Sequence, residues 1–312
     1  MNNPDISVII PFLNESENIA NLCSELEHFF ISNAHQYSAQ VIFVDDGSTD
    51  NSMELLKQQK HGSYQAKIIR LSQNYGSHAA LRAGILNATG NFITFMYADL
   101  QDPLELINKL FLECNRNRNE ITWACRGAAE NTFAERAFSK LYSSLMKKYA
   151  IASYPEKGFD IVMFSKKVQL LLNQNIEANS SIFLQILTLG FKQTNIAYVK
   201  QMRKAGKSKW TLRKKIKLFI DSFVAFSYVP IRFVTFIGIS FFVLGLIWSG
   251  YLICRKIFSG DLVSGWPTLM SILLLGFGIT NISLGIIAEY LWRTLDVSRK
   301  RPVFIIEEIT TL

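Results

Sequence analysis

The first two hundred residues alternate short, β-branched apolar runs with longer amphipathic stretches. The apolar runs have the length and composition of buried strands, and the amphipathic stretches have the period of helices. In chain order the predicted elements lie at Ile6–Ile10, Glu15–Ile31, Val41–Val44, Asn51–Lys60, Lys67–Leu71, Ser77–Asn87 and Asn91–Met96. Strands and helices in alternation predict an α/β fold whose mainly parallel sheet is covered by helices on both faces.

Two long apolar stretches follow in the last third of the chain. Phe233–Ile253 and Pro267–Ala288 contain 21 and 22 residues without a charge, close to the roughly 20 that a helix needs to cross a bilayer. Either stretch alone would also fit a buried helix of a large soluble core. Because two such stretches follow one another with a short loop between them, we predict a hairpin of two transmembrane helices.

The basic residues around these stretches predict their orientation. Nine Lys and Arg lie in 203–232 and four in 293–301, against two in the connecting loop. Cytoplasmic flanks carry the excess of Lys and Arg, so both ends of the hairpin are expected in the cytoplasm, in a multi-pass protein of the inner (cytoplasmic) membrane. The stretch 209–220 mixes basic and apolar side chains. It is interpreted as an interfacial helix rather than an ordinary solvated one.

These patterns divide the chain into four parts. They are an α/β domain at 1–200, a basic juxtamembrane region at 201–230, the two-helix hairpin at 231–292 and a cytoplasmic tail at 293–312. The N-terminus has no positive segment, and the apolar run Ile6–Phe12 is shorter than a signal-peptide core. We therefore expect that the first domain is not exported.

Charge and composition narrow the classes of partner. The chain has 312 residues, of which 49% are hydrophobic, which excludes a disordered tail, a collagen and a small disulfide scaffold. Residues 201–312 carry 15 Lys and Arg against 6 Asp and Glu, whereas residues 1–200 carry 18 against 19. Because the basic excess accompanies the apolar stretches, it indicates anionic lipid headgroups rather than nucleic acid. The four cysteines show no metal-binding spacing and are expected to be reduced.

Polar residues follow three predicted strands, at the edge where parallel sheets bind ligands. They are Asn14 and Glu15 after the first strand, Asp45 and Asp46 after the second, and Asp99 and Gln101 after the fourth. Carboxylates there can accept hydrogen bonds from a ribose or a base, although an Asp-Gly turn with a helix cap would look the same. Asp99 and Gln101 offer hard oxygen ligands suited to Mg²⁺ or Mn²⁺ on a diphosphate.

Several motifs occur in an order typical of one enzyme family. They are Val8–Glu15, Val44–Asp50, Asn74–Gly76 with Ala83 and Gly84, Ala98–Pro103, Arg203–Trp210, Glu289–Leu291 and Arg301 with Pro302. In these motifs the chain resembles inverting glycosyltransferases of the GT-A fold, family 2. It is most similar to the polyprenyl-phosphate enzymes, the relatives of dolichol-phosphate mannose synthase and bactoprenol glucosyltransferase. The resemblance covers nearly the whole chain.

The resemblance implies a Rossmann-like GT-A domain and transfer of a sugar from a UDP- or GDP-sugar to undecaprenyl or another polyprenyl phosphate. The residues implied in nucleotide-sugar binding are Pro11, Asn14, Glu15, Asp45, Asp46 and Gly76. The residues implied in binding the acceptor phosphate are Arg126, Arg136, Ser139, Arg203 and Lys209. Asp99 and Gln101 would hold Mg²⁺ or Mn²⁺, and Asp99 and Asp160 are the implied catalytic residues. A homo-oligomer is also implied.

Two positions depart from the family pattern. Tyr97 stands where family members usually carry the first Asp of an Asp-x-Asp metal motif, and no Arg follows Asp160 within the next three residues. Two alternatives therefore stay open. One is a glycosyltransferase with another acceptor, such as a processive polysaccharide synthase, although its Gln-x-x-Arg-Trp element and many spans are missing. The other is a membrane scaffold whose catalytic site has decayed.

The chemistry that the family performs needs no strong general base. A phosphate monoester has a second pKa near 6, so the lipid phosphate is largely an anionic nucleophile at neutral pH. Catalysis then depends on positioning and on stabilising charge. Arginine suits the acceptor side because its planar fork binds phosphate oxygens bidentately, although Arg126 and Arg136 would also fit surface salt bridges. For His78, an incidental position at a helix start is favoured over a contact with the nucleotide.

Overall fold

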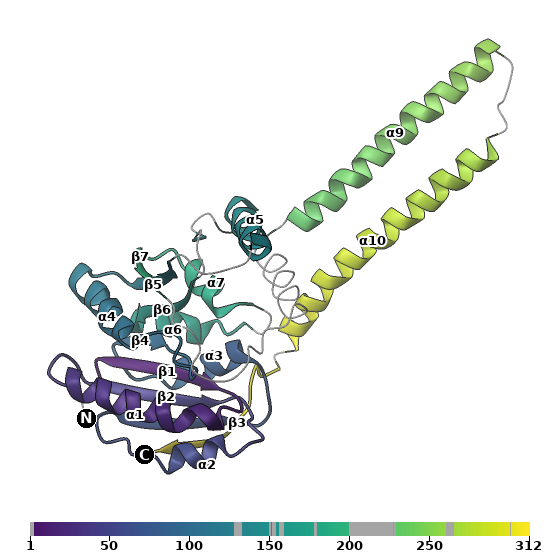
Figure 1. Cartoon of the computed structure of the whole chain (residues 1–312). Coiled ribbons are helices and arrows are strands. Elements are labelled where there is room, and N and C mark those ends of the chain that lie inside the picture. Colours follow the sequence, from purple (N-terminus) through teal and green to yellow (C-terminus); the bar gives the residue numbers. More distant parts are fainter. Residues whose placement is uncertain are drawn as a thin grey trace. The chain divides into compact units, whose positions relative to one another are not determined.

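A computed structural model of the whole chain describes residues 3–127, 133–149, 151, 154–155, 159–177, 180–199, 227, 229–259, 265–299 and 301–312. The chain divides into two compact units. The sheet unit consists of Met1–Ser222 together with Pro302–Leu312, and the hairpin unit consists of Phe223–Arg301 (Figure 1).

The sheet unit is built around eight strands in the order β7-β5-β6-β4-β1-β2-β3-β8. Their bounds are Ile6–Phe12 (β1), Ala39–Asp45 (β2), Gln65–Leu71 (β3), Phe92–Phe95 (β4), Ile121–Arg126 (β5), Phe159–Ser165 (β6), Gln193–Tyr198 (β7) and Ile306–Thr311 (β8). Four neighbouring pairs are parallel, whereas β6 runs antiparallel to β4 and β5, and β8 runs antiparallel to β3. The predicted α/β fold with a mainly parallel sheet is confirmed.

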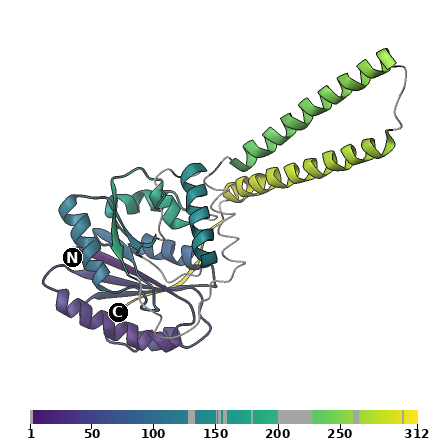
Figure 2. The same ribbon diagram turned by 45° about the horizontal axis from the view of Figure 1, so that its top comes forward.

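Helices cover both faces of this sheet (Figure 2). They are Ser16–Asn33 (α1), Ser52–Lys57 (α2), Ser77–Asn87 (α3), Glu105–Asn117 (α4), Phe133–Tyr149 (α5), Lys166–Gln174 (α6) and Ile182–Leu187 (α7). The helices α1, α2 and α4 share one hydrophobic core with the sheet, and α3 contacts α6 and α7. All residues of β1 and β2 are buried, which explains why these strands are continuous apolar runs rather than alternating ones.

The helix α3 packs closely on the centre of the sheet because Gly84 has no side chain. A Cβ at this position would lie 2.3 Å from Cγ2 of Ile9 in β1, well inside van der Waals contact. The close packing holds α3 against β1.

The predicted tail at 293–312 is not a free segment. The helix α10 continues through Ser298, and Ile306–Thr311 forms the edge strand β8 beside β3. Hydrogen bonds from Ser72 N to Ile305 O (3.0 Å) and from Leu312 N to Ala66 O (3.0 Å) extend this pairing at both ends. The β-branched residues of this segment favour a strand, but its partner lies more than two hundred residues earlier in the chain, so the sequence pattern alone did not predict the pairing.

The hairpin unit contains the helices α9 (Val229–Ser259) and α10 (Trp266–Ser298). The hydroxyl of Tyr290 in α10 donates a hydrogen bond of 3.1 Å to the carbonyl oxygen of Ser227, just before α9. Among the described residues, Leu275–Trp292 of α10 is long and apolar enough to cross a membrane, and α9 has a shorter apolar stretch at Arg232–Gly245. The two predicted helices are present, and the second membrane span stays a prediction.

Candidate functional site

The loops after β1 and β2 are joined by hydrogen bonds from backbone to side chain. The Oγ of Ser48 accepts from Asn14 N (2.9 Å), and the Oδ1 of Asn14 accepts from Thr49 N (2.8 Å). The Glu15 N–H donates to Ser52 (2.9 Å), and the Ser16 N–H donates to Asp50 (3.2 Å). Asn14 adopts a left-handed φ of 51°, which asparagine tolerates better than most residues. The structure therefore brings Asn14 and Glu15 together with the loop that follows Asp46.

Asp45, the last residue of β2, is a buried carboxylate at the base of this loop. Its side chain has no exposed surface. Its Oδ1 accepts a hydrogen bond of 2.8 Å from Ser48 N, whereas Oδ2 has no hydrogen-bond partner and lies 3.8 Å from Nε of Arg70 in β3. Burial raises the pKa of Asp45, and the Ser48 hydrogen bonds and the charge of Arg70 partly offset this effect.

Asp46 connects the loop after β2 to the start of α3. Its carboxylate accepts hydrogen bonds from the backbone N–H groups of Tyr75 (2.8 Å) and Gly76 (3.0 Å). A negative charge at this place also matches the positive end of the α3 dipole. Burial, with a smaller contribution from Asp45, raises the pKa of Asp46 to about 6. The predicted residues Asp46 and Gly76 therefore contact each other directly.

Gly47 allows the loops after β2 and β3 to approach. It has a left-handed φ of 73°, and a Cβ at this position would lie 2.5 Å from the carbonyl carbon of Gln73. Both the backbone angle and the space exclude other residues without distortion. Pro11, another predicted site residue, is buried within β1 opposite Val44 rather than placed in a loop.

A fourth loop follows β4, the neighbour of β1 in the sheet. Within it Leu100 has a left-handed φ of 51°, and the Oδ1 of Asp99 accepts a hydrogen bond of 3.3 Å from Gln101 N. The buried Asp102 accepts a hydrogen bond of 2.7 Å from the hydroxyl of Tyr198, at the end of β7. Tyr97 packs against the hydrophobic core. Where the structure describes the chain, no group of three or more His, Cys, Asp and Glu side chains could hold a metal.

Two further predicted site residues, Arg126 and Asp160, lie at the edge of the sheet where β1, β2 and β4 end. Arg126 ends β5, and Asp160 is the second residue of the antiparallel strand β6, whose Phe159 pairs with Cys125. Arg136 and Ser139 belong to α5. The side chains of these four predicted residues are outside the described part, and Arg203, Lys209 and the predicted interfacial helix at 209–220 lie entirely outside it.

A buried cationic network joins α3 to α7, and sequence analysis did not single it out. Arg82 donates to Oε1 of Gln185 (2.6 Å) and to Oγ of Ser180 (3.1 Å). Burial lowers the pKa of Arg82 to about 10. One turn earlier, burial and the Arg82 charge lower the pKa of His78 to about 4, and its ring contacts Phe183 edge-on. Arg82 lies in a helical stretch whose pattern contains no signal of this network.

Comparison with known proteins identifies two families along the chain. Residues 7–175 match the model of Glycosyl transferase family 2, which is more than half of the chain. Residues 229–293 match the model of the GtrB C-terminal hairpin. The first match contains the loops after β1 to β4 that carry the candidate site, and the second contains most of the hairpin unit.

Curated relatives match over almost the full length. The uncharacterized glycosyltransferase YkcC of Bacillus subtilis is 31% identical, and the alignment covers 97% of this chain and 93% of the relative. The prophage bactoprenol glucosyl transferase homolog of Escherichia coli is 28% identical, and the alignment covers 97% of this chain and 99% of the relative. An undecaprenyl-phosphate 4-deoxy-4-formamido-L-arabinose transferase of Edwardsiella ictaluri is 28% identical, with 97% of this chain and 94% of the relative covered.

Proposed function

The chain belongs to glycosyl transferase family 2, and from this premise we propose that it transfers a sugar from a nucleotide-sugar donor to a polyprenyl phosphate. One observation carries the acceptor assignment. The hairpin model follows the transferase model in one chain, and relatives named for bactoprenol and undecaprenyl phosphate match 97% of the chain, including that hairpin. The transfer inverts the anomeric centre, as expected for direct attack by the lipid phosphate.

The joined loops after β1, β2 and β3 form the donor site in this proposal. Asp45 ends β2, and Asn14, Glu15, Asp46 and Gly76 lie on these loops. Hydrogen bonds through Ser48 and Ser52, and from Gly76 to Asp46, hold the loops together. A site that is already ordered loses less entropy when a nucleotide binds. The buried Pro11 supports the same site from within β1, where it lies opposite Val44.

Asp99 and Gln101 would hold Mg²⁺ or Mn²⁺ on the diphosphate. One carboxylate and one amide oxygen fit this role, because Mg²⁺ sites commonly use one or two carboxylates together with phosphate oxygens and water. When bound, the ion would stabilise the negative charge of the departing nucleoside diphosphate. Tyr97 supplies no carboxylate, so the proposed site depends on Asp99 more than an Asp-x-Asp site would.

The acceptor phosphate would enter from the side of β5 and β6. Arg126 and Asp160 lie at the same sheet edge as the loop of Asp99, which supports a reaction centre between them. In the proposal Arg126, Arg136 and Ser139, with Arg203 and Lys209, hold the lipid phosphate in line with the anomeric carbon. Asp160 contacts the reacting sugar. The phosphate itself is the nucleophile, so these side chains position and neutralise rather than remove a proton.

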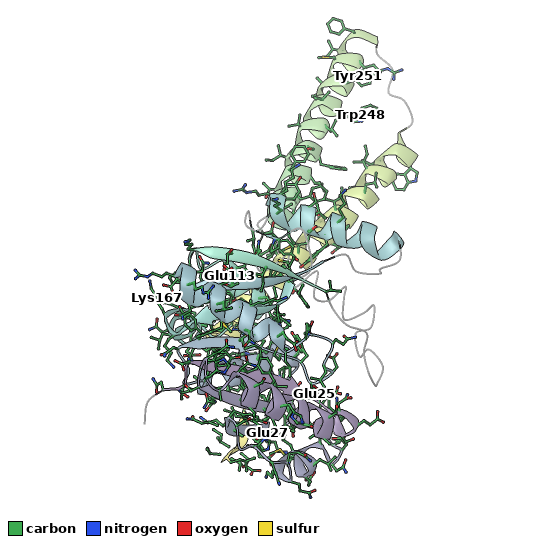
Figure 3. All side chains as sticks on the ribbon, turned by 60° about the vertical axis from the view of Figure 1, so that its left-hand side comes forward. Glu25, Glu27, Glu113, Lys167, Trp248 and Tyr251 are labelled. Carbon is green, nitrogen blue, oxygen red and sulfur yellow. The ribbon has the colours of Figure 1, made fainter. Side chains whose placement is uncertain are left out.

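The strand β8 supports a membrane hairpin with both ends in the cytoplasm. Residues before and after the hairpin unit belong to one sheet. This favours a path in which α9 begins and α10 ends on the same side of the membrane, with both helices crossing it. Trp248 and Tyr251 lie near the end of α9 (Figure 3), shortly before Arg255 and Lys256, as is common at a membrane interface. The homo-oligomer stays a prediction.

The proposal is tested by measuring release of the nucleoside diphosphate from purified, detergent-solubilised full-length protein. The assay combines UDP- and GDP-sugars with and without undecaprenyl phosphate, and with Mg²⁺, Mn²⁺ or a chelator. We expect release that requires one donor, the lipid phosphate and a metal, and that Asp99→Ala abolishes. Glu54→Gln, an exposed change on α2, is the control. Release without dependence on the lipid would indicate another acceptor, and folded protein that binds no nucleotide would indicate a decayed site.

A further inference from the structure

Arg70 lies between two carboxylates that come from opposite ends of the chain. Its Nε is 3.8 Å from Oδ2 of Asp45 in β2 and 3.4 Å from Oε2 of Glu307 in β8. The exposed fraction of the side chain rises across the three residues, from 0% for Asp45 to 36% for Arg70 and 56% for Glu307. A charged row therefore runs from the surface of the C-terminal strand to the base of the donor loop.

Two atoms in the middle of this row are buried without a hydrogen bond, namely Nε of Arg70 and Oδ2 of Asp45. Burying a carboxylate oxygen without a hydrogen-bond donor lowers the stability of the fold, and a nearby cation reduces this loss. The neighbouring charge of Asp50 acts in the opposite direction on Asp45. Arg70 therefore compensates a charge that its surroundings otherwise disfavour.

Glu307 lies between two residues of β8 that pair with β3. Glu308 pairs with Arg70 and Ile306 with Leu71, so Glu307 is at the irregularity in the register, next to Arg70. Backbone hydrogen bonds anchor the strand on both sides of Glu307, and an ion pair of 2.9 Å joins Glu308 to Lys57 of α2. A flexible arginine that is one-third exposed loses conformational entropy when it is held in one place. The carboxylate of Glu307, carried by this anchored strand, supplies a partner that favours the position of Arg70 next to Asp45.

We propose that Arg70 and Glu307 are positioning residues of the donor site, in which Glu307 holds the Arg70 guanidinium beside Asp45. The proposal rests on the proposed function, because its readout is the binding of the nucleoside diphosphate. It means that the strand following the membrane hairpin completes the nucleotide site, although it lies more than two hundred residues from the donor loops. Neither Arg70 nor Glu307 contacts the nucleotide.

The effect reaches the nucleotide through the donor loop. Asp45 accepts from Ser48 N, and Ser48 in turn accepts from Asn14 N. Loss of the compensating charge at Asp45 weakens the first of these hydrogen bonds and loosens both loops. Loosened loops bind the nucleotide less tightly, because binding must then order them. The bound sugar and the acceptor phosphate react as before, so the KM for the donor changes more than kcat.

The test measures the Kd for UDP and for GDP by calorimetry on full-length protein in detergent. We expect Arg70→Gln to weaken binding of the preferred nucleotide about tenfold, or about 1.4 kcal/mol. Glu307→Gln should weaken it about threefold, in line with a half-exposed ion pair. Arg70→Lys should restore most of the affinity, since the charge is kept. Adding Glu307→Gln to Arg70→Gln should cause no further loss, because Glu307 acts through Arg70.

Lys57→Gln is the matched control, since it removes the other ion pair of β8 and keeps the side chains of Asp45, Arg70 and Glu307. It should leave the nucleotide Kd unchanged. Equal or tighter binding by Glu307→Gln overturns the inference, and so does an equal loss in Lys57→Gln, which would reflect strand docking in general. Wild-type protein that binds UDP or GDP without lipid-dependent turnover defeats only the acceptor assignment. If wild type binds neither nucleotide, the proposed function and this inference fall together.

Discussion

Tyr198 at the end of β7 donates a hydrogen bond of 2.7 Å to the buried carboxylate of Asp102. It fastens the loop that carries Asp99 and Gln101 to a strand that lies on the far side of β5 and β6 in the sheet. Asp102 directly precedes Pro103, but the N-cap of α4 is Leu104. The hydrogen bond of Asp102 with Tyr198 instead holds the loop of the proposed metal site.

Tyr198→Phe should destabilise the fold and weaken the response to metal. Removing a donor from a buried carboxylate costs about 1–3 kcal/mol, and the loosened loop should require more Mn²⁺ for half-maximal activity. The measurements are urea unfolding and a Mn²⁺ titration of nucleotide release. Tyr64→Phe is the control, because this buried hydroxyl contacts His61 away from the loop. Equal Mn²⁺ requirements in Tyr198→Phe and wild type would contradict the prediction.

Gly47→Ala should abolish nucleotide binding, and Gly190→Ala should not. Both glycines have a left-handed backbone, with φ of 73° and 72°, so each substitution carries about 1–2 kcal/mol of backbone cost. Only at Gly47 would the added Cβ also overlap a neighbouring backbone, since nothing lies within 4 Å at Gly190. Calorimetry with UDP and GDP, together with unfolding curves, separates the two effects. Similar losses in both variants would show that contact with the loop at Gln73 is unimportant.

Tyr97→Asp should increase metal affinity while reducing stability. The substitution restores the carboxylate that the family usually has, and a second hard anionic ligand strengthens binding of Mg²⁺ or Mn²⁺. It also removes an aromatic ring that packs against the core, so the free energy of unfolding should fall. The half-saturating Mn²⁺ concentration and the thermal midpoint report the two effects. An unchanged metal requirement would indicate that the ion binds away from this loop.

The order of the first strands and helices could be predicted because it depends on local patterns. β1 and β2 are apolar runs that stay buried on both faces, and their ends carry the polar loops. The pairing of β8 with β3 was not predictable in this way. A six-residue strand at the sheet edge has no local feature that identifies its partner, and the antiparallel insertion of β6 between β4 and β5 likewise depends on the whole sheet.

The candidate site could be predicted where a motif lies on one loop, as at Asp45, Asp46 and Asp99. The different contacts of the two neighbouring carboxylates were not predictable. Asp46 accepts hydrogen bonds from the backbone of Tyr75 and Gly76. Asp45 has one buried oxygen without a hydrogen bond, which lies near Arg70. Arg70 and Tyr198 reach the site from other strands, and nothing in their local sequence marks them for that role.

His78 should make the fold less stable in acid. Its pKa is about 4 in the folded protein against an ordinary value of 6.5, so the unfolded chain binds a proton first as the pH falls. The free energy of unfolding that is present above pH 6.5 therefore falls as the pH is lowered towards 4. The loss is about 1.4 kcal/mol for each unit by which the folded and unfolded pKa of His78 differ. Asp46 acts in the opposite direction, because its folded pKa of about 6 exceeds its ordinary value of 3.8.

The two contributions are separated by comparing unfolding free energies of wild type, His78→Gln and Asp46→Asn between pH 4 and 7. His78→Gln should lose less stability than wild type as the pH falls, and Asp46→Asn should lose more. A His78→Gln curve parallel to that of wild type would show that His78 is not held neutral by burial and by Arg82.

The proposed membrane hairpin, with both of its ends in the cytoplasm, predicts that the end of α9 is reached from outside the cell. Cys23, Cys114 and Cys125 are buried, and burial raises the pKa of Cys23 to about 12, so these thiols react slowly. In a Cys254→Ser background, Ser259→Cys at the end of α9 should be labelled in intact cells by a membrane-impermeant maleimide. Glu54→Cys on α2 should be labelled only after the membrane is permeabilised. Labelling of Ser259→Cys only after permeabilisation would contradict the proposed hairpin, because α9 would then not reach the outer side of the membrane.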